Sequence, residues 1–163
     1  MVDLGGGNGH IVFPIAKTYP SLKFIVQELP GALEKGKQIV SEDAYLKDRI
    51  EFMAHDVRNE QPVRDVAAYF MCQCITNWPD KDLAAIFQQL IPALKPGSRL
   101  LIGDRKERFL GADSDVDVLE HCRVDMIVLA NTNGRVRRSD EIAEVLKMAD
   151  TRFKLRALHV KES

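Results

Sequence analysis

A glycine-rich loop near the amino terminus constrains this chain more than any other feature. Val2-Asp3-Leu4 has the pattern of a short buried strand, and Gly5-Gly6-Gly7-Asn8-Gly9 follows it directly. Apolar residues then recur at helical spacing over residues 11–17. A strand that passes through glycines into a helix is where a parallel sheet accepts a nucleotide-like ligand, because glycine lets the backbone approach the ligand closely.

Short apolar runs alternate with helical patterns along the rest of the chain. This alternation predicts an α/β fold, a mostly parallel sheet with helices on both faces. We expect a long apolar helix over 116–129, a shorter helix that is capped by Ser139 or Asp140 and runs through Met148, and a final strand over 153–160. The 163 residues, 45% of them hydrophobic, suffice for one globular domain over 1–163.

Composition narrows the possible functions. The 23 basic and 24 acidic residues nearly cancel and are scattered, so no basic stripe indicates a nucleic-acid surface. The chain shows neither a membrane-spanning run nor a targeting segment, so we expect a cytoplasmic protein. The odd set Cys72, Cys74 and Cys122 fits a reducing compartment, and Cys72 and Cys74 are expected to alternate along one strand. Because no histidine stands at ligand spacing from that pair, we expect no metal site.

Glycine spacing discriminates between nucleotide ligands. A dinucleotide fingerprint that starts at Gly5 requires glycine where the chain has His10, and the lysine of a phosphate-binding loop is missing. A Rossmann-type oxidoreductase is therefore a weak alternative. Glu28, 19 residues after Gly9, ends the second strand, where a carboxylate can accept both ribose hydroxyl hydrogens. Asp56 ends the third strand, where it can accept from an adenine amino group.

With these residues in place, the sequence resembles the plant and fungal small-molecule O-methyltransferases, which include the caffeate and sterigmatocystin types. The resemblance runs nearly end to end. It implies a Rossmann-like class I methyltransferase fold, S-adenosylmethionine as the methyl donor, and a phenolic or secondary-metabolite hydroxyl as the acceptor. The motifs that carry it are Val2-Asp3-Leu4-Gly5-Gly6-Gly7-Asn8-Gly9-His10, Val26-Gln27-Glu28-Leu29-Pro30, Asn77-Trp78-Pro79-Asp80, Leu94-Lys95-Pro96-Gly97, and Asp125-Met126 with Asn133-Gly134.

The resemblance also implies which residues hold the donor. It assigns the glycine loop to the methionine end, Glu28 to the ribose, and Asp56 with Val57 to the adenine. Trp78 matches a tryptophan near the adenine, and Cys72 stands where the family has a basic residue that steadies the donor. The full set expected to bind the cofactor is Asp3, Gly5, Gly6, Gly7, Glu28, Asp56, Val57, Cys72 and Trp78.

The catalytic positions depart from the family pattern. In the family a histidine removes the proton of the substrate hydroxyl, and the position that matches it here is Thr76, whose neutral hydroxyl cannot act as a general base near neutral pH. One of two carboxylates that orient that histidine matches Asp104; the other matches Val136. Proton loss to water, to Asp104 or to His121 on the long apolar helix stays open.

The resemblance further implies that parts of the family's chain are absent here. We expect no N-terminal dimerisation domain, because Met1 falls within the first strand, and no last antiparallel strand, so the strand over 153–160 would have an exposed edge. Two hypotheses remain. One is an O-methyltransferase with a degenerate catalytic site and a small-molecule substrate; the other is a catalytically inactive remnant or donor-binding module.

Overall fold

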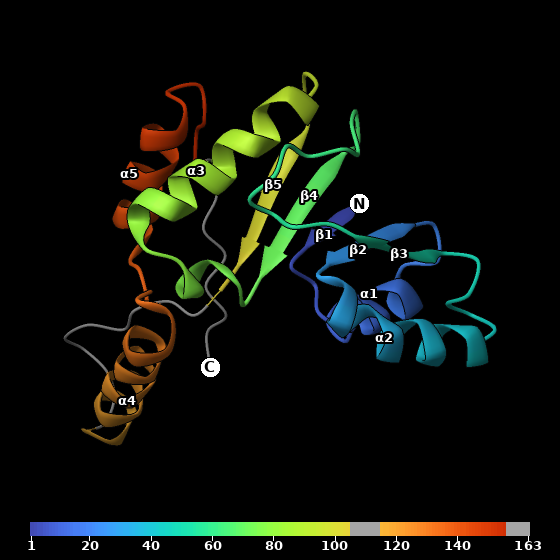
Figure 1. Ribbon diagram of the computed structural model, residues 1–163, viewed down its shortest axis with the longest axis horizontal. Helices are drawn as coiled ribbons and strands as arrows, with labels where there is room; N and C mark the ends of the chain where they lie inside the picture. Colours follow the sequence, from blue (N-terminus) through green and yellow to red (C-terminus); the bar gives the residue numbers. More distant parts are fainter. Residues whose placement is uncertain (105–114, 156–163) are drawn as a thin grey trace. The chain divides into compact units, whose positions relative to one another are not determined.

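Five parallel strands form one sheet in the order β3-β2-β1-β4-β5 (Figure 1). Their bounds are β1 Val2–Leu4, β2 Phe24–Glu28, β3 Ile50–Ala54, β4 Ala68–Cys72 and β5 Arg99–Gly103. The chain builds outward from β1 to β3 and then returns to place β4 on the other side of β1. The sequence prediction of a parallel α/β sheet is confirmed. In such sheets ligands bind beyond the carboxyl ends of the strands at the point where the order reverses, here between β1 and β4.

The computed structural model describes residues 1–104 and 115–155, apart from the side chains of 115–118, 120 and 121. These residues form two compact units. The first contains Met1–Cys74 and Gln89–Asp104 and holds the whole five-stranded sheet, while the second contains Ile75–Gln88 and the described part of Arg105–Ser163.

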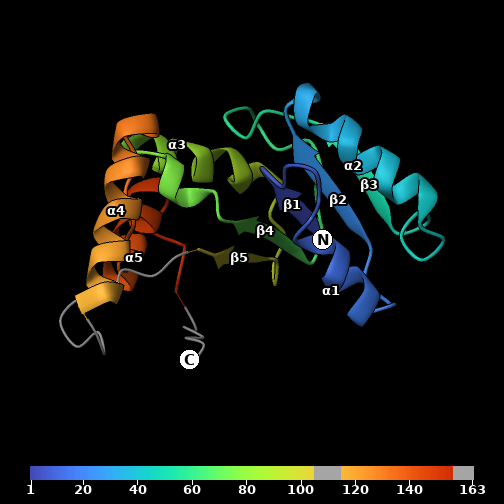
Figure 2. The same ribbon diagram turned by 90° about the horizontal axis from the view of Figure 1, so that it is seen from below.

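Two helices cover one face of the sheet in the first unit. Helix α1 spans Val12–Thr18, and α2 spans Pro30–Glu42 and begins with a proline, which is well suited to the first helical turn. Their apolar sides pack on β2 and β3 in one core (Figure 1; Figure 2). The buried residues of this core are Val12, Ala16, Phe24, Val26, Val40, Leu46 and Ile50. Burial of these apolar side chains fixes the strand ends that carry the glycine loop and Glu28.

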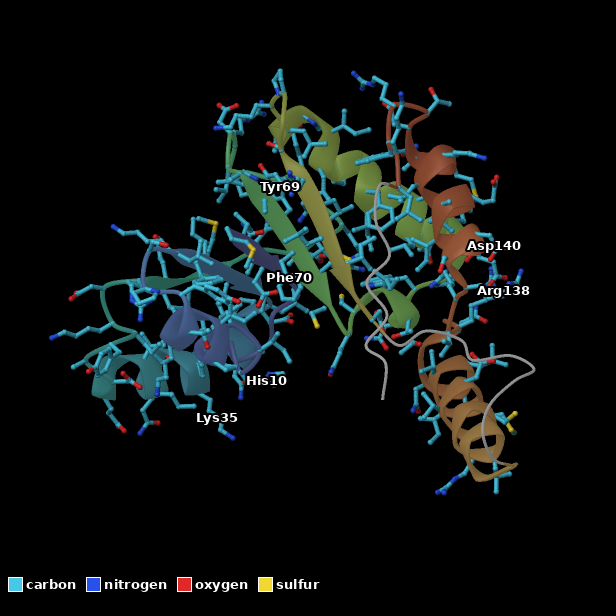
Figure 3. All side chains as sticks on the ribbon, turned by 180° about the vertical axis from the view of Figure 1, so that it is seen from behind. His10, Lys35, Tyr69, Phe70, Arg138 and Asp140 are labelled. Carbon is cyan, nitrogen blue, oxygen red and sulfur yellow. The ribbon has the colours of Figure 1, made fainter. Side chains whose placement is uncertain are left out.

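Strand β4 alternates between the two faces of the sheet. Tyr69 and Met71 are fully buried, whereas Phe70 packs against the core beneath α1 and α2 (Figure 3). The strand ends at Cys72, and Gln73 follows with a φ of 51°. The expectation that Cys72 and Cys74 alternate along one strand is therefore wrong: the left-handed turn at Gln73 ends the strand before Cys74.

The second unit is helical in its described residues. A 3-10 turn, Ile75–Asn77, leads into α3, Asp80–Leu90, whose last two residues belong to the first unit and run on into a 3-10 turn, Ile91–Ala93. Helices α4, Asp115–Thr132, and α5, Ser139–Ala149, follow. Helix α3 packs near the end of α5, where the rings of Phe87 and Phe153 lie 6.4 Å apart and the Gln88 amide donates to the carbonyl of Ala149.

Two local expectations for the second unit were inaccurate. Arg138, rather than Ser139 or Asp140, occupies the cap position of α5, and its backbone N–H donates to the Glu141 carboxylate at 2.8 Å. The strand expected over 153–160 is not formed by Phe153 to Leu155, and its remaining residues lie outside the described ones. Among the described helices, none combines the length and apolar character needed to cross a membrane.

Candidate functional site

The glycine loop turns sharply at the carboxyl end of β1. The N–H of Gly6 donates to the carbonyl of Gln27 at 3.1 Å, so the loop is tied to β2. A side chain at Gly6 would place its Cβ 2.3 Å from the Asp3 carboxylate, which leaves no room for one. Gly7 has a φ of 57°, and a Cβ there would meet no atom within 4 Å. The loop thus presents bare backbone to open space, the arrangement a bound nucleoside needs.

Asp3 lies directly beneath this loop. Its side chain is 1% exposed, and its Oδ2 atom has no hydrogen-bond partner within the described part of the chain. Burial, followed by the negative charge of Glu28, raises the pKa of Asp3 to about 7. A buried carboxyl group with an unpaired oxygen is costly, which makes Asp3 a candidate for a cationic partner supplied by a ligand.

Glu28 joins the glycine loop to the start of α2. Its Oε2 accepts the N–H of Gly7 at 3.3 Å, and its Oε1 accepts the N–H of Leu29 at 2.7 Å. A carboxylate has about four lone-pair sites, so these two bonds leave capacity for further donors such as ribose hydroxyls. The structure therefore brings Asp3, the glycines and Glu28 together, all within the first unit.

Asp56, which we expected to end the third strand, lies instead in the turn after β3, because β3 stops at Ala54. The Arg58 side chain donates to both carboxylate oxygens, and the Arg58 backbone N–H donates to Oδ1 at 2.9 Å. These bonds lower the pKa of Asp56 to about 2, so the carboxylate is ionised at neutral pH. Just before it, the N–H of His55 donates to the carbonyl of Glu28 at 3.1 Å, which continues the β2–β3 ladder and holds the turn, with Val57, beside Glu28.

Two cysteines lie beside the point where the strand order reverses. Cys72 ends β4, and Cys74 follows two residues later. Burial raises the pKa of the Cys72 thiol, as do the negative charges of Asp3 and Asp104. A Cβ added at Gly5 would lie 2.9 Å from Sγ of Cys74, so Cys74 packs directly on the glycine loop. Cys72 is thus near Asp3, one of the residues predicted to bind the donor, but a neutral thiol supplies no positive charge there.

Thr76 and Trp78 belong to the second unit. Thr76 is 8% exposed, and a Cβ at Gly134 would lie 2.0 Å from its carbonyl oxygen, so the two backbones are in contact. Val136, two residues later, is also buried, and its N–H donates to Asp125 at 2.9 Å. The indole Nε1 of Trp78 is buried without a hydrogen-bond partner among the described residues. The two altered catalytic positions predicted from sequence, Thr76 and Val136, thus lie in the same unit, with Gly134 as the residue that contacts Thr76.

Arg137 holds this segment in place. Its guanidinium is fully buried and donates to the carbonyls of Ile75 at 2.8 Å and Trp78 at 2.5 Å, and to the Asp80 carboxylate at 2.8 Å. Arg135 also bonds Asp80, and the two arginines lower the pKa of that carboxyl group. A buried charge with this many partners is satisfied, and it fixes the backbone on either side of Thr76.

Of the two predicted catalytic residues, Asp104 belongs to the first unit and Thr76 to the second. The side chain of His121 lies outside the described residues. No group of three or more candidate metal ligands occurs among the residues that the structure describes. A hollow of about 450 Å³ between α2 and β3, lined partly by Lys37 and Phe52, shares no residue with the predicted site.

Sequence reasoning missed three structural supports of the site. Gly36 in α2 admits the loop, since a Cβ there would lie 2.4 Å from the carbonyl of Asn8; a glycine inside a helical pattern was the available signal. Gln27 and Gln61 form a buried amide pair, and Arg137 forms the clamp just described. No local pattern marks these residues, because their partners are 34 to 62 positions away in the sequence.

Comparisons with known proteins agree with this geometry. A family model described as an O-methyltransferase domain matches residues 1–152. The chlorophenol O-methyltransferase of Trichoderma longibrachiatum is 38% identical over 157 residues, which cover 96% of this chain and 34% of that protein. An O-methyltransferase of the grayanic acid biosynthesis cluster of Cladonia grayi is 37% identical, over 94% of this chain and 34% of that protein. The chain thus spans about a third of the length of these relatives.

Solved structures show the same fold. The mitomycin 7-O-methyltransferase MmcR matches with a TM-score of 0.79 and 27% identity, over 91% of this chain and 41% of its own. A complex of LepI with S-adenosylmethionine matches with a TM-score of 0.78 and 26% identity, over 91% of this chain and 36% of its own. With the family model matched over nearly the whole chain and the parallel sheet, glycine loop and Glu28 in place, this chain belongs to the O-methyltransferase domain family.

Proposed function

We propose that this chain is the donor-binding domain of an S-adenosylmethionine-dependent O-methyltransferase that acts on small acidic phenols. The observation that carries the proposal is the set of polar groups at the carboxyl ends of β1 and β2. Asp3 is buried with an unpaired oxygen, Gly7 offers bare backbone, and Glu28 retains free acceptor sites. Support also comes from the family and from the SAM-bound neighbour of the same fold.

These residues fit the three parts of the donor. The methionine end carries an ammonium group, which suits the buried Asp3 carboxyl and the glycine loop. The ribose carries two hydroxyl donors, which suit Glu28. The adenine amino group suits the ionised Asp56, with Val57 beside the ring. When bound, the donor supplies an electrophilic methyl group on a positively charged sulfur.

The acceptor class follows from the groups around Thr76. A buried threonine hydroxyl cannot take a proton from a substrate near neutral pH, and Val136 has no carboxylate to orient a base. A phenol acidic enough to ionise in water needs no such base. Its phenolate oxygen forms the new bond to the methyl carbon, the carbon–sulfur electron pair stays on sulfur, and the products are an aryl methyl ether and S-adenosylhomocysteine. A chlorophenol enzyme among the relatives supports this acceptor class.

Calorimetry tests the donor site first. We expect this chain to bind S-adenosylhomocysteine and S-adenosylmethionine and to show no heat with NAD. Gly31→Ala, where an added Cβ meets nothing within 4 Å, serves as the matched control for substitutions in the loop. Absence of heat with both methionine compounds would refute the donor site, and tighter binding of NAD would instead support an oxidoreductase.

Methyl transfer tests the acceptor class. We expect transfer from labelled donor to rise with the acidity of the acceptor along phenol, 4-chlorophenol and 2,4,6-trichlorophenol, and to become independent of pH once the acceptor is ionised. A chain that binds the donor but transfers no methyl group to any acidic phenol would be the donor-binding module of the alternative hypothesis.

A further inference from the structure

Two glutamine side chains form a closed pair inside the first unit. Gln27 is fully buried and Gln61 is 1% exposed. Nε2 of Gln27 donates to Oε1 of Gln61 at 2.9 Å, and Nε2 of Gln61 donates to Oε1 of Gln27 at 2.8 Å. Each amide thus gives one hydrogen bond and accepts one.

Other groups also contact the pair. Nε2 of Gln27 lies 3.3 Å from the sulfur of Met53, and Oε1 of Gln61 accepts the N–H of Val63 at 2.9 Å. The backbone N–H of Gln61 donates to the carbonyl of Gln89 at 3.0 Å. Because an unmet buried amide costs free energy, this network favours a single arrangement of the two side chains.

The pair closes the turn that carries Asp56. At the near end of the turn, the N–H of His55 donates to the carbonyl of Glu28. At the far end, Gln61 is held by Gln27, the residue just before Glu28. The turn between them is therefore fastened at both ends to one dipeptide of β2. The same dipeptide holds the glycine loop, through the Gln27 carbonyl and the Glu28 carboxylate.

We infer that the Gln27–Gln61 pair is a specificity device for the base of the donor: it fixes the Asp56 carboxylate relative to Glu28, so that a base with an exocyclic amino group is preferred over one with a carbonyl. The two glutamines act as positioning residues, because Asp56 makes the contact to the base. This inference rests on the proposed donor site. An ionised carboxylate only accepts hydrogen bonds, so it attracts an amino group and repels a carbonyl oxygen at the same position.

The test compares S-adenosylhomocysteine with S-inosylhomocysteine, which carries a carbonyl in place of the amino group. We expect the wild-type chain to prefer the adenosyl compound by about tenfold or more in calorimetry, since a site built to bond an N–H group rejects an analogue without it. The double variant Gln27→Leu/Gln61→Leu removes both amides together. We expect it to lose about tenfold in affinity for the adenosyl compound and little for the inosyl compound, so that the preference disappears.

Two further variants separate positioning from general stability. Gln61→Asn keeps an amide but withdraws it by one methylene, and we expect it to reduce the preference as well. Tyr69→Phe is the matched control: its hydroxyl bonds the carbonyls of Val63 and Ala93 and so ties the same connection further along. It should lower the midpoint of urea unfolding while the preference stays.

A double-mutant cycle completes the test. Asp56→Asn should abolish the preference by itself, and adding the leucine pair to it should change the preference no further. The inference is overturned if the leucine pair keeps the wild-type preference, if it weakens both compounds equally, or if the wild type binds both equally well. A wild-type chain that binds neither compound overturns the proposed function itself, and the inference with it.

Discussion

Two regions of the molecule differ in the groups that they offer to a ligand. The first is the carboxyl ends of β1 and β2, and the second is the Ile75–Asp80 segment. The first region works largely through backbone: the N–H of Gly7, the bare loop, and carboxylates held by strand ends. In the second region the backbone is held by a buried side chain, because Arg137 donates to carbonyls on both sides of Thr76. Yet Thr76 and Val136, at the positions predicted for a general base and for one carboxylate that orients it, can play neither role. In the second region, the hydrogen bonds that hold the backbone are thus present although the reactive side chains are not.

The largest effect is expected at the support of the second region. Arg137→Ala leaves the carbonyls of Ile75 and Trp78 and the carboxylate of Asp80 without their buried partner, which should lower the free energy of unfolding by about 4 kcal/mol. Urea titration measures this loss. Arg138→Ala is the control, since Arg138 makes an exposed ion pair with Asp140 at 3.1 Å and should cost less than about 1 kcal/mol (Figure 3). Equal losses of unfolding free energy in the two variants would mean that the buried hydrogen bonds of Arg137 contribute no more than an exposed ion pair.

Asp3 should make the stability of the first region depend on pH. Its pKa is raised in the folded state, so between about pH 4 and pH 7 the unfolded chain ionises this group while the folded chain keeps its proton. Stability is therefore lost as the pH rises through that window. Asp3→Asn should raise the free energy of unfolding by roughly 4 kcal/mol at pH 8 and by almost nothing at pH 4.

Guanidinium titrations at several pH values measure this difference. Asp48→Asn, at an exposed position, is the control for the substitution itself. A gain from Asp3→Asn that is the same at every pH would exclude ionisation of Asp3 as its cause. The same variant should bind S-adenosylhomocysteine more weakly than wild type, because the neutral amide cannot pair with the ammonium group of the donor.

Gly6→Ala tests the backbone character of the first region. The new Cβ would collide with the Asp3 carboxylate and lie 2.9 Å from Val26, and such overpacking typically costs about 1–3 kcal/mol. We expect donor affinity to fall about 30-fold, measured by calorimetry against the Gly31→Ala control. Unchanged donor affinity would show that the loop accommodates the added methyl group without disturbing the binding site.

The smallest effect is expected from restoring side-chain chemistry to the second region. Thr76→His/Val136→Glu replaces both predicted catalytic positions. We expect transfer to unsubstituted phenol to rise about tenfold, less than the roughly 10²- to 10⁴-fold of a well-placed general base, because Thr76 is buried and the imidazole has little room. Transfer to 2,4,6-trichlorophenol should not change, since that acceptor is already ionised. A rise with both acceptors would point to improved binding rather than a restored base.

Much of the proposed donor site could be predicted from the sequence, because its residues stand at or just after the ends of consecutive strands. In a parallel sheet the carboxyl ends of the strands lie along one edge. Gly5 follows β1, Glu28 ends β2 and Asp56 lies two residues after β3, so locating the strands placed all three at that edge. Strand centres were located correctly, whereas the ends were not: β4 stops at Cys72 because Gln73 adopts a left-handed conformation that no apolar pattern reveals.

The sequence by itself determined the family, the parallel α/β fold and the class of ligand that the glycine loop suits, since these depend on local order along the chain. Only the tertiary structure decided that Asp3 is buried with an oxygen that no described residue bonds, that Gly36 admits Asn8, that Gln27 pairs with Gln61, and that Arg137 holds the segment around Thr76. Each of these rests on contacts between different elements of the fold. Their energies come from burial and from hydrogen bonds closed across the fold, which local sequence order does not encode.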